Sequence, residues 1–388
     1  MNEVKKKISI VGPCHPYRGG NALFVTHLYH SLTTKFDVQM LNYSLLYPNF
    51  LFPGTTQFDR SLQPIRPVPN IRSVNSINPV SWIQTAKRIE AFNPDLIVFD
   101  WWNPFFGPAL YSISLFLKNR FKNRVLFITE NVISHEGRWM DRFLTRIGLR
   151  HATAFLALSD NVIRDLDVLR NDRKVFRSEL PVYDCYDDLQ KFNSENEKRS
   201  LGFNKNDKVI LFFGYVRKYK GLDILIRSFP GLIKDLPDVK LLIVGEFYDD
   251  PESYLSLIDN LNLKPFVTII NQFVPNEEVG KYYSAADVVV LPYRTGTQSG
   301  ILNIAYGFER PVIVTNVGGL AESVDHELTG LVIQPDSPEA IHAGIKRFFE
   351  IQNRVNFSDH IRKKIQSNLF SGVAELFETI LLEISHDS

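Results

Sequence analysis

A chain of 388 residues is too long for one compact core and predicts two domains of ordinary size. Its 44% hydrophobic and 22% charged residues are typical of a soluble globular protein. No run approaches the ~18 apolar residues of a membrane-spanning helix, and the first residues lack the apolar stretch of a signal peptide. Cys14 and Cys185 are too far apart in sequence to indicate a disulfide framework or a metal site. We therefore expect a cytoplasmic protein.

The net charge of +1 conceals an asymmetry between the two halves. Residues 1–185 contain 23 Lys and Arg against 15 Asp and Glu, whereas the remainder contains 21 against 28. A basic first half suits an acidic partner, such as anionic lipid headgroups, nucleic acid or a phosphorylated acceptor. A solvated basic face without a partner is equally compatible. Of these we favour peripheral contact with the inner face of a membrane and expect no nucleic-acid partner.

The first half alternates short apolar runs with amphipathic segments of helical length. This alternation predicts a parallel sheet with helices on both faces. We expect strands at 8–12, 38–42, 96–100, 125–130, 155–159 and 174–177, and helices at 21–33, 79–92, 104–118, 138–151 and 161–169. Residues 44–78, rich in Pro, Asn, Ser and aromatics, are expected to form a long loop that either lines an acceptor site or is a structural excursion.

A polar, acidic segment at 180–199 is predicted to be the interdomain linker. The alternation then restarts, with strands expected at 209–214, 240–245, 267–271, 288–291, 312–315 and 330–333 and helices between them. The fold class is therefore α/β, with two Rossmann-like doubly wound domains, one over residues 1–185 and one over 200–370. The amphipathic segment 371–388 has one buried face and is expected to pack back on the first domain.

Residues 291–320 contain a strand–loop–helix–strand unit. Loops of this kind lie at the carboxyl ends of parallel strands, where ligands bind. Gln298, Ser299, Gly300 and Ile301 would meet the first turn of the helix, whose unpaired backbone N–H groups favour an anion. We expect a phosphate-bearing ligand there.

The first strand is followed by GPCHPYRGG at 12–20, which opens a helix. Gly19 and Gly20 would let the backbone approach a ligand closely. The spacing is not that of a dinucleotide fingerprint, and glycine pairs in such turns are often only structural.

A second loop, TENVISHEGRW at 129–139, places Glu130, His135, Glu136 and Arg138 together. An acid, a base and a cation in one loop suit a polar site, because unpaired buried charges are costly. His135 and Glu136 are the candidate catalytic residues, since a histidine near neutral pKa is able to orient or deprotonate an acceptor hydroxyl. A plain surface histidine is the alternative.

The loop FFGYVRKYKG at 212–221 and the sequence VGEF at 244–247 also follow strands. Arg217 and Lys220 beside a helix N-terminus suit a diphosphate, although basic runs are commonly just solvated. Glu246 would accept a hydrogen bond from a hydroxyl of the ligand, or cap the following segment.

Together these motifs make the chain resemble the retaining glycosyltransferase family numbered four, whose members have the GT-B fold of two Rossmann-like domains facing a cleft. The resemblance extends over the full length and is clearest at 209–335. It is carried by FFGYVRKYKG, VGEF, AADVVVLPY (285–293) and PVIVTNVGGLAESV (311–324).

The resemblance implies that the carboxy-terminal domain holds a nucleotide-sugar. Lys220 would bind its diphosphate, with Arg217 a near neighbour, and Gly19 and Gly20 would approach the donor from the other domain. Members need no metal, so a nucleotide-sugar substrate and no cofactor are expected.

The chain departs from the family pattern at the loop that precedes residue 300. The family's two glutamates, eight positions apart, would fall at 296 and 304 or at 297 and 305, and none of these is a carboxylate. TQSG at 297–300 instead resembles a variant subgroup. Tyr215 stands where a basic residue is usual, and Glu130 where a histidine is usual.

The function that the resemblance implies is transfer of a sugar, with retention, from a nucleotide diphosphate donor to a hydroxyl of a glycan or lipid-linked acceptor. Two alternatives stay open at this point. One is a sugar-nucleotide epimerase on the same scaffold. The other is a non-catalytic protein that binds nucleotides or glycans, which the missing glutamates would suit.

Overall fold

The computed structural model describes residues 5–52, 54–132, 139–170, 172–183 and 192–386. The chain divides into two compact units. Unit 1 comprises Met1–Asp59, Pro64–Leu180 and Leu369–Ser388, and unit 2 comprises Arg60–Gln63 and Pro181–Asn368. Candidate residues His135 and Glu136 lie outside the described residues.

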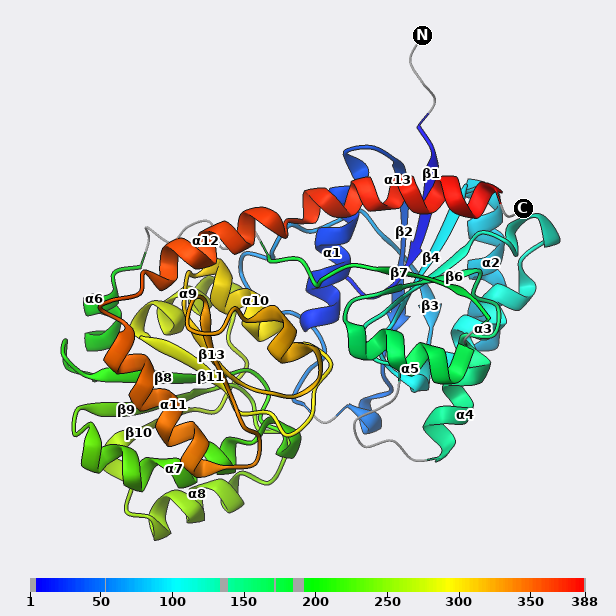
Figure 1. Ribbon diagram of the computed structural model, residues 1–388. Helices are drawn as coiled ribbons and strands as arrows, with labels where there is room; N and C mark the ends of the chain where they lie inside the picture. The colour runs from blue at the N-terminus through cyan, green and yellow to red at the C-terminus, as the bar shows by residue number, and fades with distance from the viewer. Residues whose placement is uncertain (1–4, 53, 133–138, 171, 184–191, 387–388) are drawn as a thin grey trace. The chain divides into compact units, whose positions relative to one another are not determined.

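Unit 1 is built on a parallel sheet that, in the described residues, has seven strands in the order β3-β2-β1-β4-β5-β6-β7 (Figure 1). The strands are β1 (Lys7–Val11), β2 (Asp37–Leu45), β3 (Ile71–Asn75), β4 (Leu96–Trp101), β5 (Val125–Thr129), β6 (Ala154–Ala157) and β7 (Lys174–Arg177). The helices between them are α1 (Gly20–Thr33), α2 (Pro79–Phe92), α3 (Gly107–Phe116), α4 (Trp139–Gly148) and α5 (Asp160–Arg170).

Unit 2 has a parallel sheet of six strands over its described residues, in the order β10-β9-β8-β11-β12-β13. The strands are β8 (Lys208–Phe213), β9 (Val239–Val244), β10 (Val267–Ile270), β11 (Val288–Leu291), β12 (Val312–Thr315) and β13 (Gly330–Ile333). The helices are α6 (Ser194–Ser200), α7 (Leu222–Asp235), α8 (Pro251–Asn260), α9 (Asn276–Ala285), α10 (Gly300–Gly307), α11 (Pro338–Ile351) and α12 (Phe357–Ser367).

The last helix, α13 (Phe370–His386), belongs to unit 1 and packs on α1. The Ser31 hydroxyl donates a hydrogen bond to the Phe370 carbonyl oxygen, and Lys35 forms an ion pair of 2.6 Å with Glu378. The Phe370 ring lies 5.1 Å from the His27 ring, between centroids. The chain therefore finishes in the unit in which it starts.

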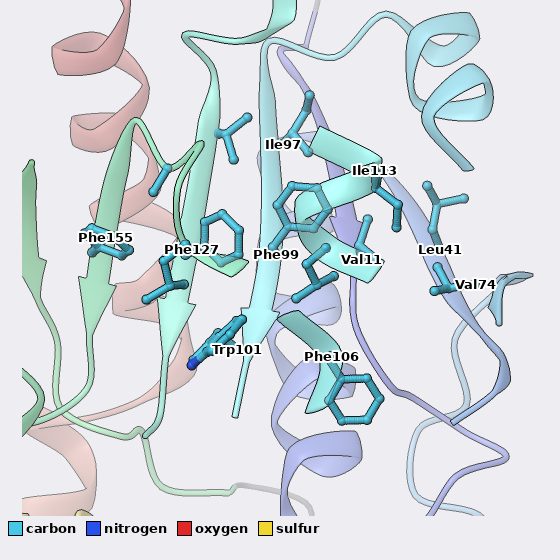
Figure 2. Packing of buried hydrophobic residues seen from close by; sticks show 14 of the residues in the cluster. Val11, Leu41, Val74, Ile97, Phe99, Trp101, Phe106, Ile113, Phe127 and Phe155 are labelled. Atoms are coloured by element: carbon cyan, nitrogen blue, oxygen red, sulfur yellow. The ribbon is translucent and has the colours of Figure 1, made fainter. Parts of the chain in front are cut away.

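The core of unit 1 is an aromatic layer on one face of its sheet. Phe99, Phe127 and Phe155 are register partners on β4, β5 and β6, and Figure 2 shows them side by side. Trp101 continues this layer beneath the crossing of α3 and α4. A Cβ added to Gly148 would lie 2.4 Å from the Trp101 ring, so only glycine permits this close approach. This packing fixes the carboxyl end of β4.

Two expectations from the sequence were wrong. Residues 44–78 are not a single loop, because β3 pairs with β2 within this segment. The run IRSVN was missed because it is short and its first residues, Ile71 and Arg72, are exposed. The expected linker 180–199 likewise contains all but the last residue of a helix, α6, which Asn193 caps by accepting a hydrogen bond from the Asn196 N–H at 3.1 Å.

The expected α/β class is confirmed, with strand and helix positions close to those predicted. Among the residues that the structure describes, no helix combines the length and the apolar character needed to cross a membrane.

Candidate functional site

In unit 2 the strand order reverses between β8 and β11. From β8 the chain adds β9 and β10 on one side, and β11, β12 and β13 follow on the other. The loops that leave β8 and β11 therefore diverge at the carboxyl edge of the sheet, which is where open α/β sheets bind ligands. Residues 214–221 form the first of these loops and residues 292–299 form the second.

The side chains of Lys220, from the first loop, and Ile301, from α10, lie close to Gly214. A Cβ added to Gly214 would lie 3.2 Å from Lys220 Nζ and 3.1 Å from Ile301 Cδ1. The φ of Gly214 is 98°, a left-handed conformation that favours glycine. The structure thus brings Lys220 and Ile301, two residues singled out in the sequence, to the same point at the end of β8.

Lys220 is a buried basic residue for which the described part of the chain supplies no counter-ion. Its side chain is 6% exposed, and its ammonium lies 5.6 Å from the centroid of the Tyr293 ring. No carboxylate within residues 192–386 pairs with it. Burial, and then the nearby charge of Arg217, lower the pKa of Lys220 from 10.5 to about 7. An anionic ligand would supply the missing negative charge and restore the charged form.

Arg217 lies beside Lys220 but remains partly exposed. Its guanidinium is 5.0 Å from the centroid of the Tyr248 ring, and that ring stacks on Tyr215 with centroids 4.5 Å apart. The aromatic contacts hold the guanidinium at the edge of the loop. Two cations in one loop form a site that favours negative charge.

The second loop leads into α10, whose N-cap residue is Ser299. The Ser299 hydroxyl does not cap the helix, because it forms a 3.0 Å hydrogen bond with the buried Tyr293 hydroxyl. The N–H groups of the first turn, which begins at Gly300, are therefore not capped by this side chain. Gln298 immediately precedes this turn and is partly exposed. This turn is suited to an anion.

Arg294 joins the two loops, and the sequence analysis did not identify it. Its guanidinium makes two 2.8 Å hydrogen bonds to the Asp223 carboxylate and a 3.0 Å ion pair with Asp336. Its backbone N–H donates to the Tyr219 carbonyl oxygen at 2.7 Å. The only sequence signal was an arginine directly after a predicted strand end. Arg294 fixes the loop that carries Lys220.

Glu246 lies at the end of β9, next to the first loop. Its carbonyl oxygen accepts a 3.0 Å hydrogen bond from the Val216 N–H, and the residue is 7% exposed. The preceding Gly245 has φ 143°, and a Cβ there would lie 2.1 Å from the Gly214 oxygen. The structure therefore places Glu246 at the same edge as Lys220, and its role toward a ligand hydroxyl stays a prediction.

In unit 1 the strand order reverses between β1 and β4. Gly19, with φ 112°, occupies the N-cap position of α1, and Gly20 is the first helical residue. A Cβ added to either glycine would meet nothing within 4 Å. The positive φ explains why position 19 is occupied by glycine. Nothing in the packing explains why position 20 is also glycine.

Two acidic residues lie at the same edge of unit 1. Asp100 is at the end of β4 and is 1% exposed, and Glu130 directly follows β5. The Asn21 side-chain amide donates a 2.9 Å hydrogen bond to Glu130 Oε2. Burial raises the pKa of both carboxyl groups, that of Glu130 to about 8. The sequence had marked Glu130 as polar but gave no sign that Asp100 lies near it.

Over the described ranges, no group of three or more His, Cys, Asp or Glu side chains is arranged to hold a metal ion. Asp223 and Asp336, which lie near the unit 2 site, form ion pairs with Arg294.

Residues 193–367 match the family described as Glycosyl transferases group 1. An uncharacterised glycosyltransferase of Methanocaldococcus jannaschii is 35% identical over 154 residues, which are 39% of this chain and 38% of that protein. The chain therefore matches less than half of the length of this curated relative.

Two solved structures are similar over nearly the whole chain. Sucrose-phosphate synthase from Thermosynechococcus elongatus has a TM-score of 0.73 at 18% identity, covering 99% of this chain and 100% of that one. HepE of Anabaena, solved in complex with UDP-glucose, has a TM-score of 0.73 at 15% identity, covering 97% and 99%. At these identities the likeness establishes the fold. Residues 193–367, within unit 2, are thus similar to the glycosyl transferases group 1 family, and the chain has the GT-B fold.

Proposed function

We propose that this chain transfers a sugar from a nucleotide diphosphate donor to a hydroxyl group of a glycan or lipid-linked acceptor. The observation that carries the proposal is the buried Lys220 ammonium, which has no counter-ion among the residues that the structure describes and lies at the edge where parallel sheets bind ligands. A diphosphate supplies the charge that this lysine lacks. The names of the curated relatives support a transferase rather than an epimerase or a non-catalytic binding protein.

In the proposed reaction the donor diphosphate becomes more negative as its bond to the sugar breaks. Lys220, Arg217 and the first turn of α10 would stabilise this charge without a metal ion. Such groups are most effective when they are fixed in advance, and Arg294 fixes the Lys220 loop through Asp223. We expect retention of anomeric configuration, and we propose that Gln298 and Ser299 contact the donor in place of the family's paired glutamates.

The test is a turnover assay of the full chain with uridine, guanosine and adenosine diphosphate sugars. The panel begins with uridine donors because HepE was solved with UDP-glucose. Acceptors are a lipid extract and a set of glycosides, and mass spectrometry detects glycosylated products. We expect product formation to require an acceptor and one class of donor. A changed sugar configuration in the donor without any acceptor would identify an epimerase instead, and nucleotide binding without turnover would identify a binding protein.

We also propose that α4 contacts an anionic membrane surface that carries the acceptor. Trp139, Met140 and Phe143 are 78%, 50% and 56% exposed on this helix. Arg142 and Arg146 are exposed on the same helix. Large apolar side chains interleaved with arginines are typical of helices that lie in the headgroup region of anionic bilayers.

Vesicle co-sedimentation tests the membrane contact. We expect binding to phosphatidylglycerol-containing vesicles and much weaker binding to pure phosphatidylcholine. The double change Trp139→Ala with Phe143→Ala should abolish it. Val168→Ala is the matched control, because Val168 is 76% exposed on a different helix, α5. Equal binding of the double variant and the wild type would remove α4 as the contact.

A further inference from the structure

A cavity of about 690 Å³ lies at the amino edge of the unit 2 sheet. Its lining residues Asp287 and Pro311 directly precede β11 and β12, which run parallel, and residues 352–358, between the end of α11 and the start of α12, form another wall (Figure 1). Lys220 lies at the opposite, carboxyl edge of this sheet, so the cavity is separate from the proposed nucleotide site. Its volume is that of a small-molecule site, for which about 300–1,000 Å³ is usual.

Arg310 lines this cavity with few partners of its own. Its Nε is buried, and no residue that the structure describes accepts a hydrogen bond from it. Its Nη2 donates one long hydrogen bond of 3.4 Å to the Ser284 carbonyl oxygen. The residue as a whole remains partly exposed. Buried N–H groups are almost always hydrogen-bonded, so the contacts within unit 2 do not explain why an arginine stands here.

The two carboxylates that border the cavity are already neutralised by other cations. Asp287 forms a 2.9 Å ion pair with Lys198, and Glu309 forms a 2.9 Å ion pair with Arg362. Within residues 192–386, neither carboxylate lies close enough to Arg310 to form an ion pair. The positive charge of Arg310 is therefore not matched by a neighbouring side chain.

A guanidinium does not escape burial by losing its proton. Burial lowers the pKa of Arg310, and the charges of Asp287 and Glu309 act in the opposite direction. Arginine nevheless keeps its proton in proteins at all ordinary pH values. Arg354, exposed at the same cavity, also lacks an ion-pair partner in the described part of the chain. Two arginine charges thus remain available to an anion at one cavity.

We propose that this cavity binds a small organic phosphate, with Arg310 and Arg354 contacting its phosphate group. A phosphate monoester carries a charge of about −1.5 to −2 at pH 7, which matches two arginines, whereas a single carboxylate matches one. Its oxygens also accept the paired N–H groups of a guanidinium. Phe308, Phe348 and Val355 line the cavity and suit the carbon skeleton of the ester.

Isothermal titration calorimetry of the full chain tests this site, with phenyl phosphate and inorganic phosphate as probes at constant ionic strength. We expect saturable binding of both probes and tighter binding of phenyl phosphate, because its ring would contact the apolar wall. Arg310→Met should raise the Kd of phenyl phosphate about tenfold or more, since it removes a charged hydrogen-bond donor. Without ligand this variant should be at least as stable as the wild type, because an unsatisfied buried donor has been removed.

A second variant keeps the test valid if Arg310→Met does not fold. Arg354→Glu changes an exposed side chain and should also raise the Kd about tenfold, because it places a negative charge beside the phosphate. Lys363→Glu is the matched control, since it makes the same change of charge at an exposed position of α12 that does not line the cavity. Its Kd should stay within about twofold of the wild type.

Lys220→Ala separates this cavity from the proposed nucleotide site. Phenyl phosphate should still bind this variant, because Lys220 lies at the other edge of the sheet. Binding lost in Lys220→Ala but retained in Arg310→Met and Arg354→Glu would overturn the inference, as would equal losses in Arg354→Glu and Lys363→Glu or no saturable binding. Equal affinity for the two probes would contradict an organic phosphate as the ligand. Since every readout is binding, a failure of sugar transfer leaves this inference standing.

Discussion

The two units share a sheet architecture but differ in the charge that they bury at its carboxyl edge. In unit 2 the loop after β8 buries the Lys220 ammonium, and no carboxylate within residues 192–386 forms an ion pair with it. In unit 1 the end of β4 buries the Asp100 carboxyl, and no described residue donates a hydrogen bond to it. Both residues lie where the strand order reverses. One topology has therefore produced two sites of opposite electrostatic character.

The difference indicates what each unit binds. A buried cation is made stable by an anion, which fits the diphosphate of a nucleotide donor. In unit 1, burial raises the pKa of the Asp100 carboxyl, so this edge of the sheet does not favour an anion. The fold alone does not assign these ligands, because doubly wound sheets carry many functions. The assignment follows from the side chains.

The largest effect is expected when the unit 2 cation is removed. Lys220→Ala should weaken nucleoside diphosphate binding about 30-fold or more, because loss of one partner of a buried charge pair costs about 2–5 kcal/mol. Isothermal titration calorimetry measures this change. Lys218→Ala is the control, since Lys218 lies in the same loop with an exposed side chain. Equal losses in both variants would show that only the general positive charge of the loop matters.

The affinity of unit 2 for a nucleotide should also depend on pH. The free protein holds Lys220 with a pKa of about 7, and a bound diphosphate should raise that pKa toward its usual 10.5. Binding then takes up a proton above neutrality, and affinity should fall by up to about tenfold per pH unit as pH rises above about 7. Binding titrations between about pH 6 and about pH 9 measure how steeply the nucleotide affinity changes with pH. A Lys220→Met variant should bind the nucleotide weakly, and its affinity should no longer depend on pH through this residue. If the affinity of the variant changes with pH as steeply as that of the wild type, Lys220 is not the source of the pH dependence.

Stability without ligand should respond to pH in opposite directions in the two units. Between about pH 7 and 10.5 the unfolded chain binds more protons at Lys220 than the folded chain, so this residue makes stability rise with pH. At Glu130, between its usual 4.5 and about 8, the folded chain binds more protons, so stability falls with pH. Asp100, whose pKa is also raised, acts in the same direction.

Thermal unfolding of variants measures separately how Lys220 and Asp100 make stability depend on pH. Lys220→Met should stabilise the protein relative to the wild type below about pH 7, with a benefit that shrinks at higher pH. Asp100→Asn should stabilise it progressively as pH rises above about 4, because burial raises the pKa of Asp100 and asparagine needs no proton to remain neutral. Benefits that do not change with pH would mean that packing, rather than charge, determines the stability of both positions.

The sequence predicted the fold better than the sites. Strands and helices show in local patterns of apolar residues, whereas the sites depend on contacts between residues that are far apart in the sequence. Alternating apolar runs are local, and they placed most strands within a few residues. The short edge strand β3 escaped because its pairing with β2 spans a long connection. Lys220 was identified because it follows a strand within a glycine-bounded loop.

Pairs formed across the fold had no such local signal. Arg294 and Asp223 are 71 residues apart, yet they form the bidentate contact that fixes the Lys220 loop. In the sequence, residue 100 appeared only as the end of an expected strand, and the proximity of Asp100 to Glu130 depends on the pairing of β4 with β5. Burial and the missing partners of Lys220 and Asp100 became evident only with the structure. These are the properties that distinguish the two sites.

The smallest expected effect tests whether the glycine pair of unit 1 belongs to its site or only to its fold. Gly19 has φ 112°, so Gly19→Ala should destabilise the protein by about 1 kcal/mol or more. Gly20 has an ordinary helical conformation and open space around its Cα, so Gly20→Ala should leave stability unchanged or raise it slightly. Thermal unfolding and the KM of each substrate are measured together. If Gly20→Ala folds normally but raises a KM several-fold, glycine is needed there because a substrate approaches the backbone. If neither quantity changes, Gly20 has no part in binding, and its glycine reflects neither the fold nor a substrate contact.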